Sequence, residues 1–162
     1  MANMFRPVPI DQEPKRKNRF VLEFPTELGI ESFLVQTSGK PKLAIGETEI
    51  TYMNSSSWVA GRAVWEAIDI SFIDVIGPST TQKVMEWVRL HFEPSTGRMG
   101  YAVGYKKNLV LKGLDPVGAE VEKWTLVGCM ITSAEFDDYD YSSDDIAAVN
   151  ITVRPDKCLL AA

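Results

Sequence analysis

A run of aspartates between residues 138 and 145 is the densest group of side chains in the sequence that could perform chemistry. Four oxygen-bearing residues in it have the alternate spacing of calcium ligands: Asp138, Asp140, Ser142 and Asp144. A calcium loop of this kind also needs a glycine at its sixth position and a bidentate glutamate at its twelfth, where this chain has Ser143 and Val149. We therefore expect no metal site, and interpret the run as a charged connection that discourages edge-to-edge aggregation.

The other reactive residue types are sparse. His91 is the only histidine, so a Ser-His-Asp or Cys-His pair would have to use it, and zinc sites with two or three histidines are excluded. It ends a predicted amphipathic helix, where a packed imidazole is typical. Cys129 and Cys158 lack CxxC spacing and are interpreted as unpaired thiols in a reducing compartment. With no nucleotide-binding glycine motif present, we expect no catalytic residue, no cofactor and no enzymatic activity.

Composition narrows the possible partners. The chain has 162 residues and a formal net charge of −5, so its surface as a whole repels phosphate and argues against tight nucleic-acid binding. The basic run at residues 15–19 is the local exception and is interpreted as a solvated lead-in to the first strand. No apolar run is long enough to span a bilayer, and we expect no membrane insertion. Residues 1–17, with three prolines, predict an extended N-terminal arm, and residues 18–160 a single domain.

The elements that must position these residues are mostly strands. Alternation of apolar and polar residues predicts strands at residues 18–24, 32–38, 47–53, 64–74 and 107–114, and two further β-rich arms between 121 and 155. One helix is predicted at about 80–92, with Ser79 as its N-cap and Gln82 completing a capping box. This pattern indicates a mainly β fold, a β-sandwich or barrel with one appended helix.

Two stretches do not follow simple alternation. The arm that starts at residue 121 is apolar at both parities, with Leu126 and Met130 at one and Cys129 and Ile131 at the other, so we expect both of its faces to be covered. Residues 54–62 are small, polar and glycine-containing and predict a loop, although this loop carries Trp58. That tryptophan either folds back onto the protein's own core or inserts into a neighbouring subunit.

Several segments together resemble one known family, and order and spacing carry the likeness. They are NRFVLEF from residue 18, YMNSSSWVAGRAVWEAIDISFID over 52–74, the helix TQKVMEWV, and the closing VEKWTLVGCMITSAEFDDYDYSSDDIAAVNITVRPD. The chain resembles the tail tube proteins of contractile-tailed bacteriophages, which are related to the inner tube proteins of pyocins and injection machines.

The resemblance implies a structural protein. Protomers would join into a homohexameric ring with a continuous inner β-barrel, and stacked rings would form a tube that conducts DNA from capsid to host cell. Its partners would be other copies of itself, the tail sheath protein, the baseplate initiator, the tail terminator, the tape-measure protein and, transiently, DNA. It would reside in the virion, and in the host cytoplasm during assembly. The tube of a secretion or injection system is the closer alternative, and a β-barrel enzyme or a ligand- or calcium-binding domain the more distant one.

The resemblance and the strand parity also suggest site residues. The segment 52–62 matches a family loop that makes ring-to-ring contacts, which implies an inter-ring role for Met53, Asn54, Trp58 and Arg62. Parity places four polar residues on the outward faces of long strands: Glu47, Glu49, Asp69 and Ser71. We predict that these four face the lumen, where carboxylates would let DNA slide without sticking; a position facing the outer solvent or the sheath is the alternative.

Overall fold

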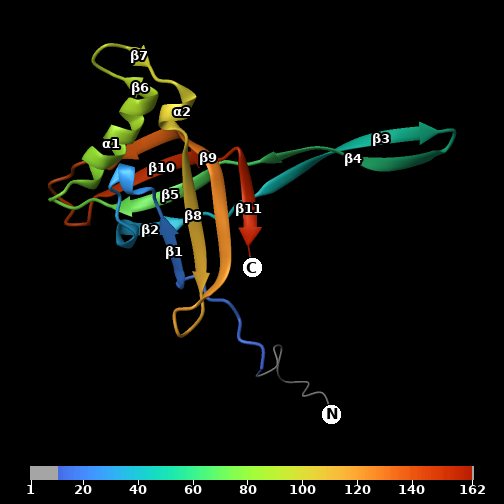
Figure 1. Ribbon diagram of the computed structural model, residues 1–162, viewed down its shortest axis with the longest axis horizontal. Coiled ribbons are helices and arrows are strands. Elements are labelled where there is room, and N and C mark those ends of the chain that lie inside the picture. The colour runs from blue at the N-terminus through green and yellow to red at the C-terminus, as the bar shows by residue number, and fades with distance from the viewer. Residues whose placement is uncertain (1–10, 162) are drawn as a thin grey trace.

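In residues 11–161, which the computed structural model describes, seven strands form one antiparallel sheet in the order β1-β8-β9-β10-β5-β2, with β11 also paired to β9 (Figure 1). Its strands are β1 (Phe20–Glu23), β2 (Val35–Ser38), β5 (Ile68–Ile73), β8 (Lys107–Leu114), β9 (Glu120–Phe136), β10 (Ala148–Arg154) and β11 (Lys157–Ala161). The 17-residue β9 belongs to both halves, because its first part pairs with β8 and β11 and its second part with β10.

The remaining strands form two separate hairpins. The long one consists of β3 (Leu43–Tyr52) and β4 (Ser55–Trp65), and the short one of β6 (Phe92–Glu93) and β7 (Arg98–Met99). The helices are α1 (Thr80–His91) and the four-residue α2 (Ala102–Tyr105), and two single 3-10 turns lie at Thr26–Leu28 and Ser32–Leu34. The predicted mainly β fold with one substantial helix is confirmed, whereas α2 and the β6–β7 hairpin were not anticipated.

One hydrophobic core joins both halves of the sheet to α1. Its fully buried side chains come from β1, β5, α1, β8, β9 and β10, and the largest are Trp87, Phe72, Leu22, Ile70, Leu109, Leu126 and Ile151. Strands β5 and β10 each bury alternate residues, as their sequences predict, because one face packs on the core and the other does not. The strand at residues 64–74 is interrupted at 66–67, where β4 ends and β5 begins.

Two bulges in β9 explain why this strand is apolar at both parities. Between Leu126 and Cys129 the pairing with β8 shifts by one residue, and Gly128 there has φ 68°. A second extra residue lies before Ser133, where the pairing with β10 shifts. Each bulge reverses which parity faces the core, so Leu126 and Cys129 are both buried in the same core. The bulges therefore account for part of the apolar pattern within the protein's own core. Val127 and Met130 are half-buried and are not part of that core, and the expectation that this second face is covered stays a prediction.

Helix α1 begins where predicted and ends one residue earlier, but its cap differs from the predicted capping box. The Ser79 side chain makes no capping hydrogen bond. Instead, the carboxylate of Asp74, at the end of β5, accepts from the Thr81 backbone N–H at 3.3 Å and from Thr81 Oγ1 at 2.7 Å. A carboxylate at this end also suits the helix dipole, so the strand that precedes the helix supplies its cap.

His91 is a packed imidazole, as predicted. Its Nδ1 donates to the Trp87 carbonyl at 3.0 Å, its Nε2 accepts from the Ile131 backbone N–H at 3.1 Å, and its ring stacks on Tyr105 with 4.4 Å between centroids. Burial lowers the pKa of this imidazole below its ordinary 6.5. Since both ring nitrogens are engaged within the fold, His91 joins the C-terminal end of α1 to β9.

The two cysteines are unpaired and buried, as predicted. Burial raises the pKa of the Cys129 thiol to about 12 and that of Cys158 to about 11. Both thiols therefore stay protonated at neutral pH, the form in which a thiol is a poor nucleophile.

The predicted N-terminal arm is described only from residue 11, and residues 1–10 lie outside the described residues. Residues 11–17 are exposed and lead into β1 (Figure 1). Lys15 Nζ bonds to Glu122 Oε2 at 2.6 Å, which attaches the arm to the start of β9.

Candidate assembly surfaces

The β3–β4 hairpin projects away from the body of the protein (Figure 1). Every residue of β3 and all but the last residue of β4 are exposed. At a rise of about 3.3 Å per residue, its ten-residue strand β3 spans roughly 33 Å. A two-stranded hairpin without a third strand or a covering helix is marginally stable in water. We therefore expect this hairpin to be stabilised by packing against another protein surface.

The predicted loop at residues 54–62 is wrong, because most of it is strand β4. Only Met53 and Asn54 turn the chain, with Met53 at φ 53°, and Ser55 Oγ bonds to the Tyr52 carbonyl at 2.9 Å across the turn. Small polar residues usually indicate a loop, but here they occupy an exposed strand that does not pack against the core. The paired residues opposite them supply the β-branched and aromatic side chains.

The pairing register defines the two faces of the hairpin, since residues directly opposite each other in an antiparallel pair share a face. Glu49 is paired with Trp58, and Glu47 with Ala60, so both glutamates lie on the tryptophan's face. The opposite face carries Thr48, Val59, Ile50 and Tyr52.

Both faces of the hairpin leave large apolar side chains in water. Trp58 is 57% exposed, so it does not fold back onto the protein's own core. The exposed apolar residues of the hairpin are Leu43, Ile45, Ile50, Tyr52, Met53, Trp58, Val59 and Val64. An exposed apolar group of this size is typical of a protein-protein interface.

The four residues predicted to make inter-ring contacts all lie on this hairpin. Met53 and Asn54 form its tip, Trp58 lies along its length, and Arg62 lies at a bulge beside Gly61. Gly61 has no room for a side chain without crowding the backbone of Gly46, at 3.2 Å from its carbonyl oxygen. The structure thus brings these four together on one projecting element, and their inter-ring role stays a prediction.

A second candidate surface is the outward face of β2, β5, β10 and the end of β9. Its side chains line a shallow hollow of about 380 Å³. The polar residues of this face are Thr37, Asp69, Ser71, Ser133, Glu135, Asn150 and Thr152. Two of them are carboxylates and none is cationic; Arg154 lies further along β10. Thr152 Oγ1 donates to Asp69 Oδ1 at 2.8 Å, which orients that carboxylate across the strand pair.

The four residues predicted to face the lumen fall on two different surfaces. Asp69 and Ser71 belong to this polar sheet face, whereas Glu47 and Glu49 lie on the hairpin beside Trp58. Sequence reasoning missed Ser133 and Glu135 because the β9 bulges reverse the parity on which it relied. The outward alternation of β10 did carry a signal for Asn150 and Thr152, which pair with them.

The aspartate run forms the connection between β9 and β10, as predicted. Asp140 Oδ1 accepts from the Ser142 backbone N–H at 2.9 Å, and Asp137 Oδ2 accepts from the Ala148 N–H at 3.0 Å. These contacts shape the loop internally. Among residues 11–161, no group of three or more His, Cys, Asp or Glu side chains is arranged to hold a metal ion.

A membrane-spanning helix is also not found: within the described part of the chain, each helix is too short or too polar to cross a bilayer.

Comparison with known proteins gives a match in fold and none in sequence. No family model matches the chain, and no curated protein matches it. A chain of the anti-feeding prophage cap, the AFP tube terminating cap, superposes with a TM-score of 0.75 at 18% identity, covering 100% of this chain and 99% of that one. A chain of the PVC sheath/tube terminator, from an extracellular contractile injection system, gives 0.75 at 16% identity, covering 93% and 99%. A chain of the PVC sheath-tube complex gives 0.72 at 16%, covering 92% of each.

These identities are low, so the likeness is one of fold. It extends over 100%, 93% and 92% of this chain in the three structures. The fold is therefore that of tube and terminator proteins of contractile injection systems, which agrees with the resemblance that the sequence carries.

Proposed function

We propose that this chain is a structural subunit of the tube of a contractile tail or injection machine, and that it assembles with copies of itself. The projecting β3–β4 hairpin is the observation that carries the proposal. It exposes apolar side chains on both faces and lacks a third strand in the described chain. In a ring or a stack of rings, a neighbouring copy would cover these faces and supply the missing stability.

The polar sheet face is proposed to line the channel. Among the described residues that line its hollow, hydroxyl, amide and carboxylate side chains offer a polyanion no cationic partner, so DNA would pass there without being held. Arg154, further along β10, lies outside the hollow. Around a closed ring, the Asp69 and Glu135 carboxylates would repeat once per subunit. The sequence resemblance favours a conduit for DNA. The tube of an extracellular injection system is favoured by the PVC structures, which share this fold.

The role is proposed to be passive. Within residues 11–161, both nitrogens of His91 are occupied by the fold and both thiols are buried, which supports a protein without turnover. Its proposed partners are further copies, a sheath protein, a baseplate initiator, a terminator and a tape-measure protein, and its proposed location is the assembled tail.

A tube terminator is the second candidate, because the AFP cap and the PVC terminator both superpose with TM-scores of 0.75 and with 99% of their chains covered. A terminator and a tube subunit would each form a ring, but they differ in whether a further ring binds to its free face. A tube subunit adds further rings, whereas a terminator ends the stack.

Negative-stain microscopy and light scattering of the purified protein test both candidates. Rings that stack into tubes are expected for a tube subunit, and single rings that do not grow are expected for a terminator. A protein that stays monomeric at high concentration in all buffers would overturn the assembly role altogether.

A further inference from the structure

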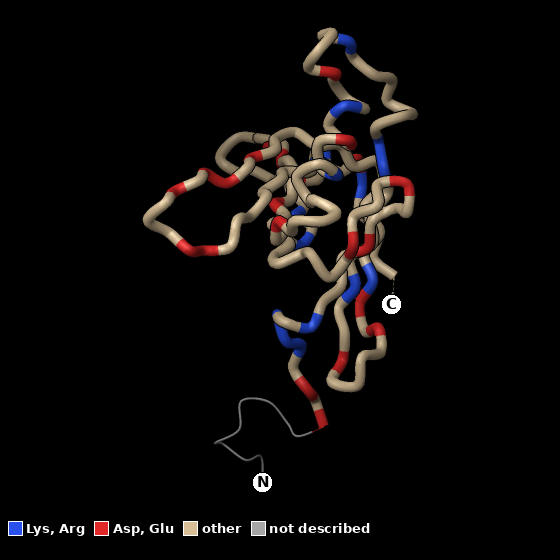
Figure 2. The backbone as a smooth tube through the Cα atoms, turned by 90° about the vertical axis from the view of Figure 1, so that its left-hand side faces the viewer, with Lys and Arg blue, Asp and Glu red and all other residues tan. Residues whose placement is uncertain are grey.

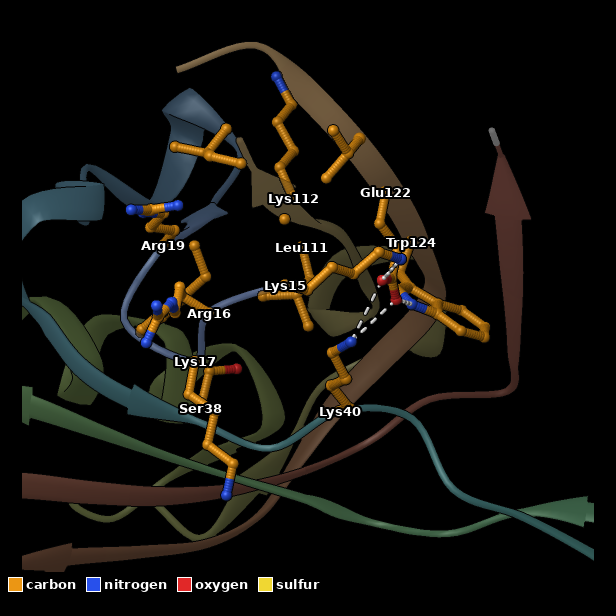
Figure 3. Close-up of a pocket in the computed structure, with 14 residues that line it drawn as sticks. Lys15, Arg16, Lys17, Arg19, Ser38, Lys40, Leu111, Lys112, Glu122 and Trp124 are labelled. Carbon is orange, nitrogen blue, oxygen red and sulfur yellow. Dashed lines mark hydrogen bonds and ion pairs between the residues drawn. The ribbon is translucent and has the colours of Figure 1, made fainter. Parts of the chain in front are cut away.

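A basic pocket lies where the N-terminal arm crosses the β1, β8 and β9 end of the sheet (Figure 3). Its volume is about 410 Å³, and its apolar lining includes Phe20, Leu111 and Trp124. On one side stands Glu122, whose carboxylate accepts from Lys15, Lys40 and the Trp124 indole N–H. These donors lower the pKa of Glu122 to about 2, so it stays ionised and its charge is already matched by cations.

The opposite side of the pocket has cations that are not matched by any carboxylate among residues 11–161. Figure 3 shows Arg16, Lys17 and Arg19 across the pocket from Glu122, with the Lys17 side chain extending away from the two arginines. Within residues 11–161 none of the three makes an ion pair, whereas Lys15, Lys40 and Lys112 all do. The pocket therefore combines an apolar floor with three unpaired positive charges, which together suit an anionic segment that also carries an aromatic ring.

The loop between β9 and β10, residues 137–146, has the complementary composition. It contains five aspartates and no lysine or arginine, and none of its carboxylates forms an ion pair in the described chain. Tyr139 and Tyr141 in this loop are 97% and 112% exposed. Figure 2 shows the carboxylate-rich loop on one side of the molecule and the basic segment of the arm near its lower end, so the two surfaces lie apart within one copy.

We propose that the acidic loop of one copy docks into the basic pocket of a second copy. Asp138, Asp144 and Asp145 would face Arg16, Lys17 and Arg19, and the Tyr139–Tyr141 segment would place a ring over the apolar floor. This inference rests on the proposed assembly of the chain with itself, and it names a contact in addition to the β3–β4 hairpin. Because the loop and the pocket are different surfaces, the contact is head-to-tail and can repeat around a ring or along a stack.

Charge reversal tests the contact in two variants. The loop variant carries Asp138→Lys, Asp144→Lys and Asp145→Lys. The pocket variant carries Arg16→Glu, Lys17→Glu and Arg19→Glu. Asp137 and Asp140 are kept because their carboxylates accept hydrogen bonds that shape the loop. The matched control, Glu31→Lys, Glu66→Lys and Glu86→Lys, changes the net charge as the loop variant does, at exposed positions elsewhere.

Each variant alone is expected to need at least about a hundredfold higher concentration to assemble than the wild type, because like charges then meet in every copy of the contact. Mixed at equal amounts, the two variants are expected to assemble again, since the lysine loop of one fits the glutamate pocket of the other and the native loop fits the native pocket. Circular dichroism and thermal melts show that each variant is folded, and the control variant is expected to assemble as the wild type does.

Calorimetric titration of the loop variant into the pocket variant gives the contact a readout that does not depend on ring formation. A heat at equimolar ratio that disappears at high salt is expected, because exposed charges are screened. Absence of association between the two folded variants, or normal assembly of either one alone, would overturn the docking and leave the tube proposal standing. A wild type that associates only into open head-to-tail oligomers and never forms rings or tubes, combined with variants that bind each other, would overturn the tube proposal and keep the contact.

Discussion

The β3–β4 hairpin and the β5–β10 pair show the same alternation of side chains in two different settings. In β5 and β10, Ile70 and Ile151 are buried while their polar neighbours face outward. In the hairpin, Ile50 and Trp58 lie on opposite faces and both are exposed. Alternation therefore tells which residues share a face, whereas burial depends on what covers that face. In the body the chain itself supplies the cover, and in the hairpin we propose that a neighbouring copy does.

The largest expected effect on stability is that of a substitution in the core of the body. Trp87 is fully buried, and its Nε1 donates to the Tyr105 carbonyl at 2.9 Å. Trp87→Ala is expected to lower the free energy of unfolding by about 3–5 kcal/mol, because it removes a large buried side chain and leaves a cavity. Urea unfolding followed by circular dichroism measures this loss. A change below about 1 kcal/mol would mean that α1 is not part of the core.

A smaller effect is expected at the first β9 bulge, which directs Leu126 and Cys129 into one core. Gly128 has φ 68°, and an added Cβ would lie against the Asp156 carboxylate. Gly128→Ala is expected to lower the free energy of unfolding by about 1–3 kcal/mol through backbone strain and this clash. Gly97→Ala is the matched control, since Gly97 has φ 70° and nothing within 4 Å of the added Cβ. Equal losses of unfolding free energy in the two variants would mean that backbone strain alone, without the clash, explains the effect.

The body is also expected to respond to pH through His91, which fastens α1 to β9. Burial lowers the pKa of His91 in the folded state, so the unfolded chain binds the proton first as the pH falls below 6.5. The free energy of unfolding should therefore be constant well above 6.5, decrease as the pH falls below that value, and level off below the folded-state pKa. His91→Gln, which removes the only histidine, is expected to abolish the decrease between pH 7 and 5.5 in urea titrations. An unchanged decrease would assign it to carboxylates.

The sequence predicted the body well where one face of an element packs on the core. Strand β8 has the predicted bounds, and α1 begins at the predicted Thr80 and ends within one residue of the predicted end. These elements are periodic, and their caps and breaks are local. The β9 bulges could not be predicted from one strand alone, because they arise where β9 pairs with three different strands. At the first bulge, the Asn108 side chain also accepts a hydrogen bond from the Gly128 N–H at 3.1 Å.

The candidate surfaces were predicted less completely, for a related reason. Small polar residues hid strand β4, because a strand outside the core needs no apolar face. The polar sheet face takes residues from β2, β5, β9 and β10, so its membership depends on the order of strands. Asp69 and Ser71 could be proposed from parity within one strand, whereas Ser133 and Glu135 required the register of β9 against β10.

The smallest effect on folding is expected for a substitution of Trp58. This residue also tests most directly whether the hairpin, unlike the core, is covered by a neighbouring copy. Because Trp58 is 57% exposed on a hairpin outside the core, Trp58→Ala should change the free energy of unfolding by no more than about 0.5 kcal/mol. The same substitution should prevent ring stacking, since it removes the largest side chain that a neighbour could bury. Val117→Ala, at an exposed apolar residue in the turn between β8 and β9, is the control and should leave assembly unchanged.

The pairing of Trp58 with Glu49 extends this test to the predicted lumen residues. A face that packs against a neighbouring copy is not a channel wall, so the inter-ring role of Trp58 and the lumen role of Glu49 compete for one face. If the neighbour covers this face, Glu49→Lys should weaken assembly together with Trp58→Ala, while Asp69→Lys on the polar sheet face should leave assembly intact and give the tube a new affinity for DNA. Sedimentation and DNA binding of the three variants distinguish the two roles. Normal assembly of Glu49→Lys together with new DNA binding would instead place the glutamates of the hairpin in the lumen.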